Sequence, residues 1–143
     1  MPATTVKVMG ILAGKNIVVT GILTEASLAF GVAQLAQREG ATVLLTGAGR
    51  GLSITERTAR KLDTPAHVVE FDVTVADHVA SAREAARTHL GRVDGVLHSI
   101  GFAPASCLGD DFMAPQWADV SVAMEISAYS LKTLAERDRK STR

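Results

Sequence analysis

The sequence predicts an α/β fold built on a doubly wound parallel sheet, with helices covering both faces. Three observations predict it. Short apolar runs rich in β-branched residues alternate with longer segments of helical periodicity. Glycine or proline follows most of the helical segments and ends them. The chain has 143 residues with 47% hydrophobic content, enough for one core and one domain. Strands that alternate with helices of this length imply parallel βαβ units with right-handed crossovers.

The first βα unit predicts a glycine turn between a strand and a helix. Asn16–Thr20 is a short apolar run that indicates a buried strand. Gly21 follows it and allows a tight turn, and Ser27 occupies the position of a helix N-cap. Helical spacing continues to about Arg38, and Gly40 ends the helix. A helix N-terminus of this kind leaves backbone N–H groups free to bind a pyrophosphate.

Three more strands and two more helices follow. The second unit is a strand at residues 41–46, a glycine-rich turn at 47–51 and a helix at 52–62 that Pro65 ends, with Ile54, Thr58 and Leu62 on its inner face. The third is a strand at 67–72 and a helix at 74–90, with Asp77 in its first turn and Val79, Ala82, Ala86 and Leu90 facing the sheet. A fourth strand is predicted at residues 93–98.

Charge and composition exclude several classes of function. Fifteen basic and fifteen acidic side chains cancel, so no net field attracts nucleic acid or anionic membranes. The single Cys107 forms no internal disulfide, and four scattered histidines show no metal-ligand spacing. Residues 1–13 are too short and too broken in hydropathy for a signal peptide or membrane span. We therefore expect a cytoplasmic protein without a metal site.

Two glycine-rich turns compete for a phosphate site at the carboxyl ends of the strands, where such sheets bind ligands. Neither contains G-x-G-x-x-G. Thr46–Ser53 is similar to the T-G-x-x-x-G-x-G loop of ordinary short-chain dehydrogenases, with Ser53 in place of the last glycine, and Asp72 follows at roughly the distance of a ribose ligand, about 20 residues. The order of the whole chain favours the turn at Gly21, because a fold beginning at the second strand leaves residues 15–40 without a place.

Four separated motifs follow one another along the chain: Gly21–Phe30, Phe71–Val73, His98–Pro104 and Ile126–Ser130. Together and in this order they resemble the enoyl-acyl-carrier-protein reductases, a divergent branch of the short-chain dehydrogenase/reductase superfamily. The NADH-dependent mycobacterial and actinobacterial forms are the most similar, and the resemblance runs from about Leu12 to Glu136. It implies a Rossmann-like sheet truncated after about four strands and their helices, with residues 1–136 as the amino-terminal, NAD-binding half of a reductase and 137–143 as a charged tail.

The resemblance also implies roles for individual residues. Residues at the first turn are expected at the pyrophosphate and adjoining ribose, a pair after the third strand at the adenine, a trio after the fourth strand along the centre of the cofactor, and one helical residue near the nicotinamide ribose. In that order they are Gly21, Ile22, Ser27 and Leu28; Asp72 and Val73; Ser99, Ile100 and Gly101; and Ile126. Phe102 is expected on the substrate side.

The sequence departs from the family at the catalytic acid. Members carry a tyrosine followed seven positions later by a lysine, which polarise the thioester and hold the nicotinamide ribose. Here Tyr129 is followed at that spacing by Glu136, so no catalytic residue is assigned. We expect the chain alone to be inactive.

Three hypotheses for function follow. The first is NADH-dependent reduction of an enoyl thioester carried by acyl-carrier protein or coenzyme A, in fatty acid synthesis, with a homo-oligomer implied by the resemblance. NADPH is the disfavoured cofactor, although Arg50 after the second strand is a possible partner for its 2′-phosphate. The second is a non-catalytic dinucleotide-binding or assembly module. The third, a methyltransferase using S-adenosylmethionine, is disfavoured because no acidic residue ends the second strand.

Overall fold

The computed structural model describes residues 10–136, and their centre is a four-stranded parallel sheet in the order β3-β2-β1-β4. The strands are β1 Asn16–Val19, β2 Thr42–Gly47, β3 His67–Glu70 and β4 Gly95–Leu97. β1 pairs with both β2 and β4, so the strand order reverses beside it. Ligands bind parallel sheets of this topology at such a reversal, outside the carboxyl ends of the strands. The predicted sheet is confirmed, and the expected tail at 137–143 lies outside the described residues.

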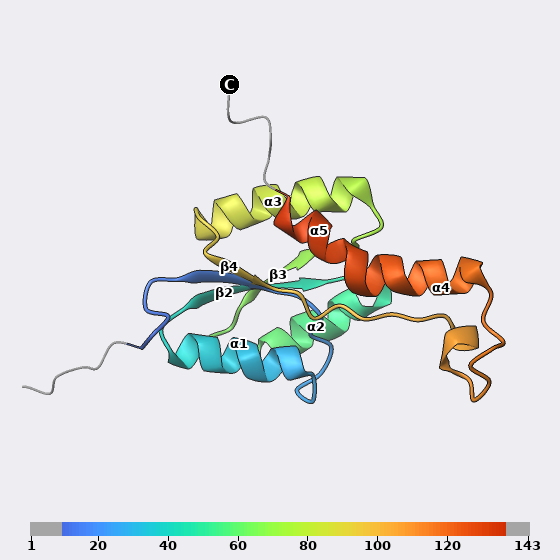
Figure 1. Ribbon diagram of the computed structural model, residues 1–143. Coiled ribbons are helices and arrows are strands. Elements are labelled where there is room, and N and C mark those ends of the chain that lie inside the picture. The colour runs from blue at the N-terminus through green and yellow to red at the C-terminus, as the bar shows by residue number, and fades with distance from the viewer. Residues whose placement is uncertain (1–9, 137–143) are drawn as a thin grey trace, which may run out of the picture.

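Helices cover both faces of this sheet, as Figure 1 shows. α1 Leu28–Arg38 and α2 Leu52–Ala59 lie on one face, and α3 Ala76–Leu90 and α5 Ser130–Ala135 lie on the other. α4 Trp117–Met124 continues into α5 through a π-helical turn, η3, at Glu125–Tyr129. Two short 3₁₀ turns complete the described chain: η1 Gly49–Gly51 and η2 Ala105–Leu108. Within residues 10–136, no helix is long and apolar enough to span a bilayer.

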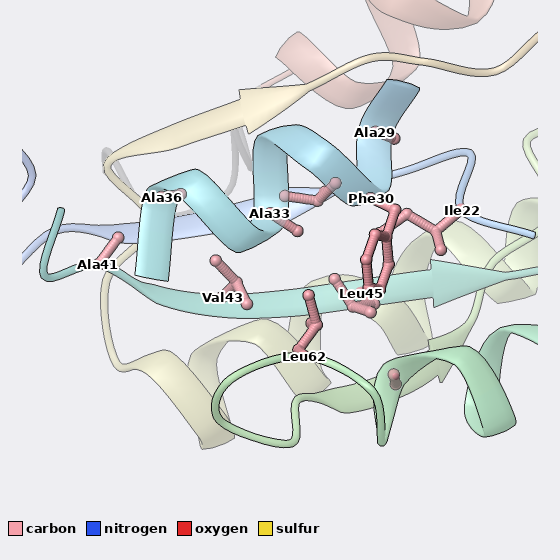
Figure 2. Close-up of a cluster of buried hydrophobic side chains, with 11 residues drawn as sticks. Ile22, Ala29, Phe30, Ala33, Ala36, Ala41, Val43, Leu45 and Leu62 are labelled. Atoms are coloured by element: carbon pink, nitrogen blue, oxygen red, sulfur yellow. The ribbon is translucent and has the colours of Figure 1, made fainter. Parts of the chain in front are cut away.

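Alternation along the strands divides the core between the two faces. Val19 and Leu45 belong to the cluster beneath α1, whereas their neighbours Val18 and Leu44 pack with Ala86 of α3. The α1 cluster is the larger, and Figure 2 shows it between α1 and β2. The inner side of α1 is built from small residues around Phe30: Ala29, Ala33 and Ala36, all buried. These small side chains let α1 lie close to the sheet.

The predicted α2 is wrong in its end and in part of its buried face. The helix ends at Ala59, and the chain then turns so that Leu62 is buried outside the helix. Ile54 is 37% exposed, whereas Thr55 and Thr58 are buried. Their hydroxyls donate to the carbonyls of Ile22 at 2.6 Å and Leu23 at 2.7 Å. Hydrogen bonds to the turn after β1, rather than apolar side chains, therefore select the inner face of α2.

α3 begins two residues later than the periodicity predicts, at Ala76. The Asp72 carboxylate accepts hydrogen bonds from the backbone N–H of Thr74 at 2.9 Å and from its hydroxyl at 2.6 Å. This local turn competes with the helix for the same residues and holds residues 72–75 outside it. The predicted inner face of α3 is confirmed around Ala86 and Leu90, which pack against the sheet.

Candidate functional site

A cleft of about 390 Å³ lies at the carboxyl ends of the strands. Each of the four strands contributes to its wall the residues at or just after its end, and α2 and η3 complete the wall. The lining residues are Gly21, Ile22, Leu23, Thr46, Gly47, Ala48, Thr55, Phe71, Asp72, Val73, Ser99, Ile100, Gly101, Phe102 and Ile126. The cleft thus brings together all the predicted site residues except Ser27 and Leu28.

Gly21 lies in the wall of this cleft against the backbone of another strand end. Its φ is +80°, a left-handed conformation that side chains rarely adopt. A Cβ there would lie 1.9 Å from the carbonyl oxygen of Ser99, which follows β4. Both constraints require glycine. Its neighbour Ile22 is 1% exposed and buries its side chain in the core, so it offers the cleft mainly backbone.

Ser27 and Leu28 lie beside the cleft rather than in its wall. Ser27 is the N-cap of α1 by its backbone angles, but its hydroxyl oxygen does not cap the helix. The oxygen instead accepts hydrogen bonds from the N–H groups of Leu23 and Thr24, at 3.1 Å each, and so closes the turn. Leu28 is 88% exposed. The prediction that Ser27 is the N-cap position of the helix is confirmed. Its hydroxyl bonds to the preceding turn and not to the helix, which the sequence alone does not indicate.

The second glycine-rich turn borders the same cleft through Gly47 and Ala48. Gly49 also has a positive φ, +48°, yet a Cβ there would meet nothing within 4 Å. Arg50 is exposed on η1 and does not line the cleft. The two turns that compete in the sequence are therefore neighbours in space. A Cβ on Gly47 of the second turn would lie 3.0 Å from Oγ1 of Thr55, whereas a Cβ on Gly21 would meet the backbone of another strand end.

Asp72 lies at the β3 side of the cleft with its carboxylate held in place. The two hydrogen bonds from Thr74 lower the pKa of this carboxyl below its ordinary value, with a smaller contribution from His78. The group is therefore ionised at neutral pH. Both of those bonds reach Oδ1, so Oδ2 keeps its capacity to accept a hydrogen bond from a ligand in the cleft.

Six further wall residues had no predicted site role: Leu23, Thr46, Gly47, Ala48, Thr55 and Phe71. The glycine-rich pattern was a signal for Gly47 and Ala48. Thr55 gave no signal, because its hydroxyl bonds to a carbonyl 33 residues away.

The described residues place neither a metal site nor a protonated general acid in the cleft. Residues 10–136 contain no group of three or more His, Cys, Asp or Glu side chains that could hold a metal ion. Asp72 is the one titratable side chain among the described residues that line the cleft. Tyr129 is 60% exposed outside it, and the ammonium of Lys132 lies 5.4 Å from its ring centroid. The cleft can bind and orient a ligand, and its described wall supplies no proton donor.

A second cavity, of about 330 Å³, lies between the sheet and the two helices α3 and α5 that cover one of its faces. Its wall is mainly aliphatic, and it shares only Thr46 and Phe71 with the cleft among the described residues. None of the predicted site residues lines it. The cleft at the strand ends is therefore the candidate site, because the glycine approach, the backbone groups and the ionised carboxylate meet there.

Comparison with known proteins identifies the family. A family model described as "Enoyl-(Acyl carrier protein) reductase" matches residues 21–142. A relative from Mycolicibacterium smegmatis, named enoyl-[acyl-carrier-protein] reductase [NADH], is 42% identical over 131 residues, covering 89% of this chain and 48% of the relative. A relative of the same name from Mycobacterium avium is 36% identical over 130 residues, covering 89% and 48%.

A third relative, from Staphylococcus aureus, is named for NADPH and is 33% identical over 131 residues, covering 90% of this chain and 51% of the relative. The chain thus spans about half the length of the curated relatives it matches. The family match covers most of the chain and includes every residue of the cleft. This chain belongs to the enoyl-[acyl-carrier-protein] reductase family.

Proposed function

We propose that the cleft binds NADH and that the chain is the cofactor-binding part of a reductase that reduces the double bond of an enoyl thioester on acyl-carrier protein. The observation that carries the proposal is the contact between Gly21 and Ser99. A Cβ on Gly21 would collide with the Ser99 carbonyl, so only glycine lets these two strand ends meet, and the cleft at the carboxyl ends of the strands opens beside their backbones. The domain that binds NADH comprises residues 1–136.

Each part of NADH has a matching part of the wall. Oδ2 of Asp72 would accept a hydrogen bond from the adenine amino group, with Val73 beside the ring. The backbone of Gly21 and Ile22 would border the pyrophosphate, and the hydroxyl of Ser27 and the amide of Leu28 lie next to that turn. Further wall residues would face the ribose and nicotinamide: Ser99, Ile100, Gly101 and Ile126. Phe102, 51% exposed, would border the acyl group.

The bound cofactor supplies the hydride, and the described residues supply its position. The Ser99–Phe102 loop would cover one side of the nicotinamide half and orient it toward the thioester. We assign no proton donor. The names of the mycobacterial relatives support NADH as the cofactor. NADPH is the second choice of cofactor. The glycine-rich end of β2 carries no carboxylate that would repel its 2′-phosphate, and Arg50 on η1 could pair with that phosphate.

The alternative is a non-catalytic dinucleotide-binding or assembly module. The observation that favours it is that Asp72, the one titratable side chain among the described residues in the cleft wall, is ionised and cannot donate a proton. We place either form in the cytoplasm, with self-association into a homo-oligomer.

The test measures NADH binding and turnover separately. We expect NADH to raise the unfolding temperature of the 143-residue chain, with no oxidation of NADH when a short enoyl-coenzyme A is added. Removing a positioned general acid typically costs 10²–10⁴-fold in rate, and loss of substrate positioning adds to that.

A fusion to the carboxyl-terminal half of a mycobacterial relative should turn over the same substrate. Binding without turnover in the fusion would favour the non-catalytic module. Absence of NADH binding by both proteins would contradict the proposed function. Turnover by the 143-residue chain at the rate of the fusion would contradict the claim that this chain supplies no proton donor.

A further inference from the structure

The helix formed by α4 and α5 widens into the π-turn Glu125–Tyr129 beside the loop that follows β4. The cause is local. The hydroxyl of Ser130 donates to the carbonyl of Ile126, four residues back, at 2.6 Å. The backbone N–H of Ser130 reaches the carbonyl of Glu125, five residues back. The side chain thus takes the carbonyl that an α-helical N–H would use, which is how serine disturbs helices, and π-turns often occur at functional sites.

Two serines of this region hold the loop. Ser127 Oγ accepts a hydrogen bond from the N–H of Phe102 at 2.9 Å and donates to its carbonyl, also at 2.9 Å. Ser130 Oγ lies 2.7 Å from Nε2 of His98. Because the single hydrogen of the Ser130 hydroxyl goes to Ile126, Nε2 of His98 is the donor in this bond. Ser130 is 3% exposed, so competition from water is weak.

The other side of the loop is fixed to β1. The N–H of Ser99 donates to Oγ1 of Thr20 at 3.0 Å, and Oγ1 of Thr20 donates to the carbonyl of Leu97 at 2.8 Å. Thr20 is fully buried. The carbonyl of Ser99 faces Gly21. The loop is therefore held between the end of β1 and the π-turn, and its residues together with Ile126 form one wall of the cleft.

We propose that Ser127 and Ser130 are positioning residues that set the affinity of the cleft for the nicotinamide half of NADH. Neither serine lines the cleft, so each acts through the residue it holds. Ser127 satisfies both backbone groups of Phe102, and Ser130 ties His98 to the helix that carries Ile126. This inference rests on the proposed function, because it requires that NADH occupy the cleft.

The experiment compares the affinities of NADH and ADP, measured by calorimetry on the 143-residue chain. ADP lacks the nicotinamide half, so it reports the adenine side alone. Ser127→Ala should lower the affinity for NADH roughly tenfold, because it removes the two hydrogen bonds that hold the loop at Phe102. The affinity for ADP should stay within about twofold of its original value. Ser127→Thr, which keeps the hydroxyl, should recover most of the NADH affinity.

Ser121 provides the matched control. It lies on α4, and its hydroxyl donates to the carbonyl of Ala118 at 2.8 Å, within the same helix. Ser121→Ala should leave both affinities unchanged. Ser127→Cys, similar in size and weaker in hydrogen bonding, replaces the alanine variant if the latter does not fold, with a smaller loss of NADH affinity expected.

Two results would overturn the proposal: a Ser127 variant that binds NADH as tightly as the original chain, or one that loses NADH and ADP to the same extent. The second result would mean that the serine only stabilises the fold. Failure of the unsubstituted chain to bind NADH is a different outcome and contradicts the proposed function itself.

Discussion

The two glycine-rich turns of this chain have similar composition but different surroundings. Gly21, after β1, has a positive φ and no space for a Cβ, which would lie 1.9 Å from the carbonyl oxygen of Ser99. Gly49, after β2, has a positive φ and open space around it. Gly49 needs glycine for its own backbone conformation alone, whereas Gly21 needs it also for the close approach to another strand end. The two turns therefore differ in the contacts their glycines make in the folded chain, and the number of glycines in each turn does not reveal this difference.

The largest predicted effect is at the first turn. Gly21→Val places a branched side chain in a left-handed conformation and against the Ser99 carbonyl. We expect loss of detectable NADH binding and a loss of stability of several kcal/mol. Calorimetry and urea denaturation measure the two effects. Retention of NADH affinity within a few-fold would contradict the role of this turn.

A second prediction concerns Thr55, which joins the turns. Its hydroxyl donates to the Ile22 carbonyl of the first turn and lies 3.1 Å from the Gly51 carbonyl of the second. Thr55→Val keeps the shape but leaves a buried carbonyl without its donor, at a cost of about 1–3 kcal/mol in the free energy of unfolding. Urea denaturation measures it. Thr88→Val, at an exposed position on α3, is the control. Equal small effects for both would mean that the turns are not coupled through Thr55.

The third prediction is a smaller effect at the second turn. Gly49→Val meets no neighbouring atom, so its cost comes from the left-handed backbone alone, on the order of 1–2 kcal/mol. The affinity for NADH should fall by less than about threefold, because this turn borders the cleft without crowding it. A larger loss of NADH affinity than for Gly21→Val would place the pyrophosphate at the second turn.

The resemblance to the reductase family, not periodicity, indicated most of the cleft residues. Sequence periodicity predicted the sheet and its helices, because these depend on apolar runs and helical spacing within each segment. It was wrong about Ile54 and did not find Thr55, because the inner face of α2 is chosen by hydroxyl donors that reach carbonyls after β1. It placed Ser27 at the start of α1 but not the direction of its hydroxyl, which depends on how the turn closes. Contacts between segments more than 30 residues apart leave no periodic signal.

The smallest predicted effect on stability separates the stabilising role of Asp72 from its binding role. Hydrogen bonds from Thr74 lower its pKa in the folded chain, so the unfolded chain takes up the proton first as the pH falls. The stability this gives is complete above the unfolded pKa, about 3.9, and is lost as the pH falls through the lower folded value. Urea denaturation at pH values from about 2.5 to 6 should show that acid lowers the free energy of unfolding less for Asp72→Asn than for the unsubstituted chain.

The same substitution should lower the affinity for NADH several-fold at neutral pH, because the amide of asparagine is a poorer acceptor for the adenine amino group than the carboxylate of Asp72. An acid profile identical to that of the unsubstituted chain would contradict the stabilising role of Asp72. Unchanged NADH affinity would contradict its place at the adenine.

The most direct test of the account is an NMR titration of the 15.0 kDa chain with NADH, which reports every backbone amide at once. We predict that the largest shifts fall on Gly21, Asp72, Ser99 and Gly101, with smaller shifts at Gly47 and Ala48. Shifts confined to residues 49–53, or gathered on Val79, Ala82 and Leu134 around the cavity between α3 and α5, would contradict the cleft as the dinucleotide site.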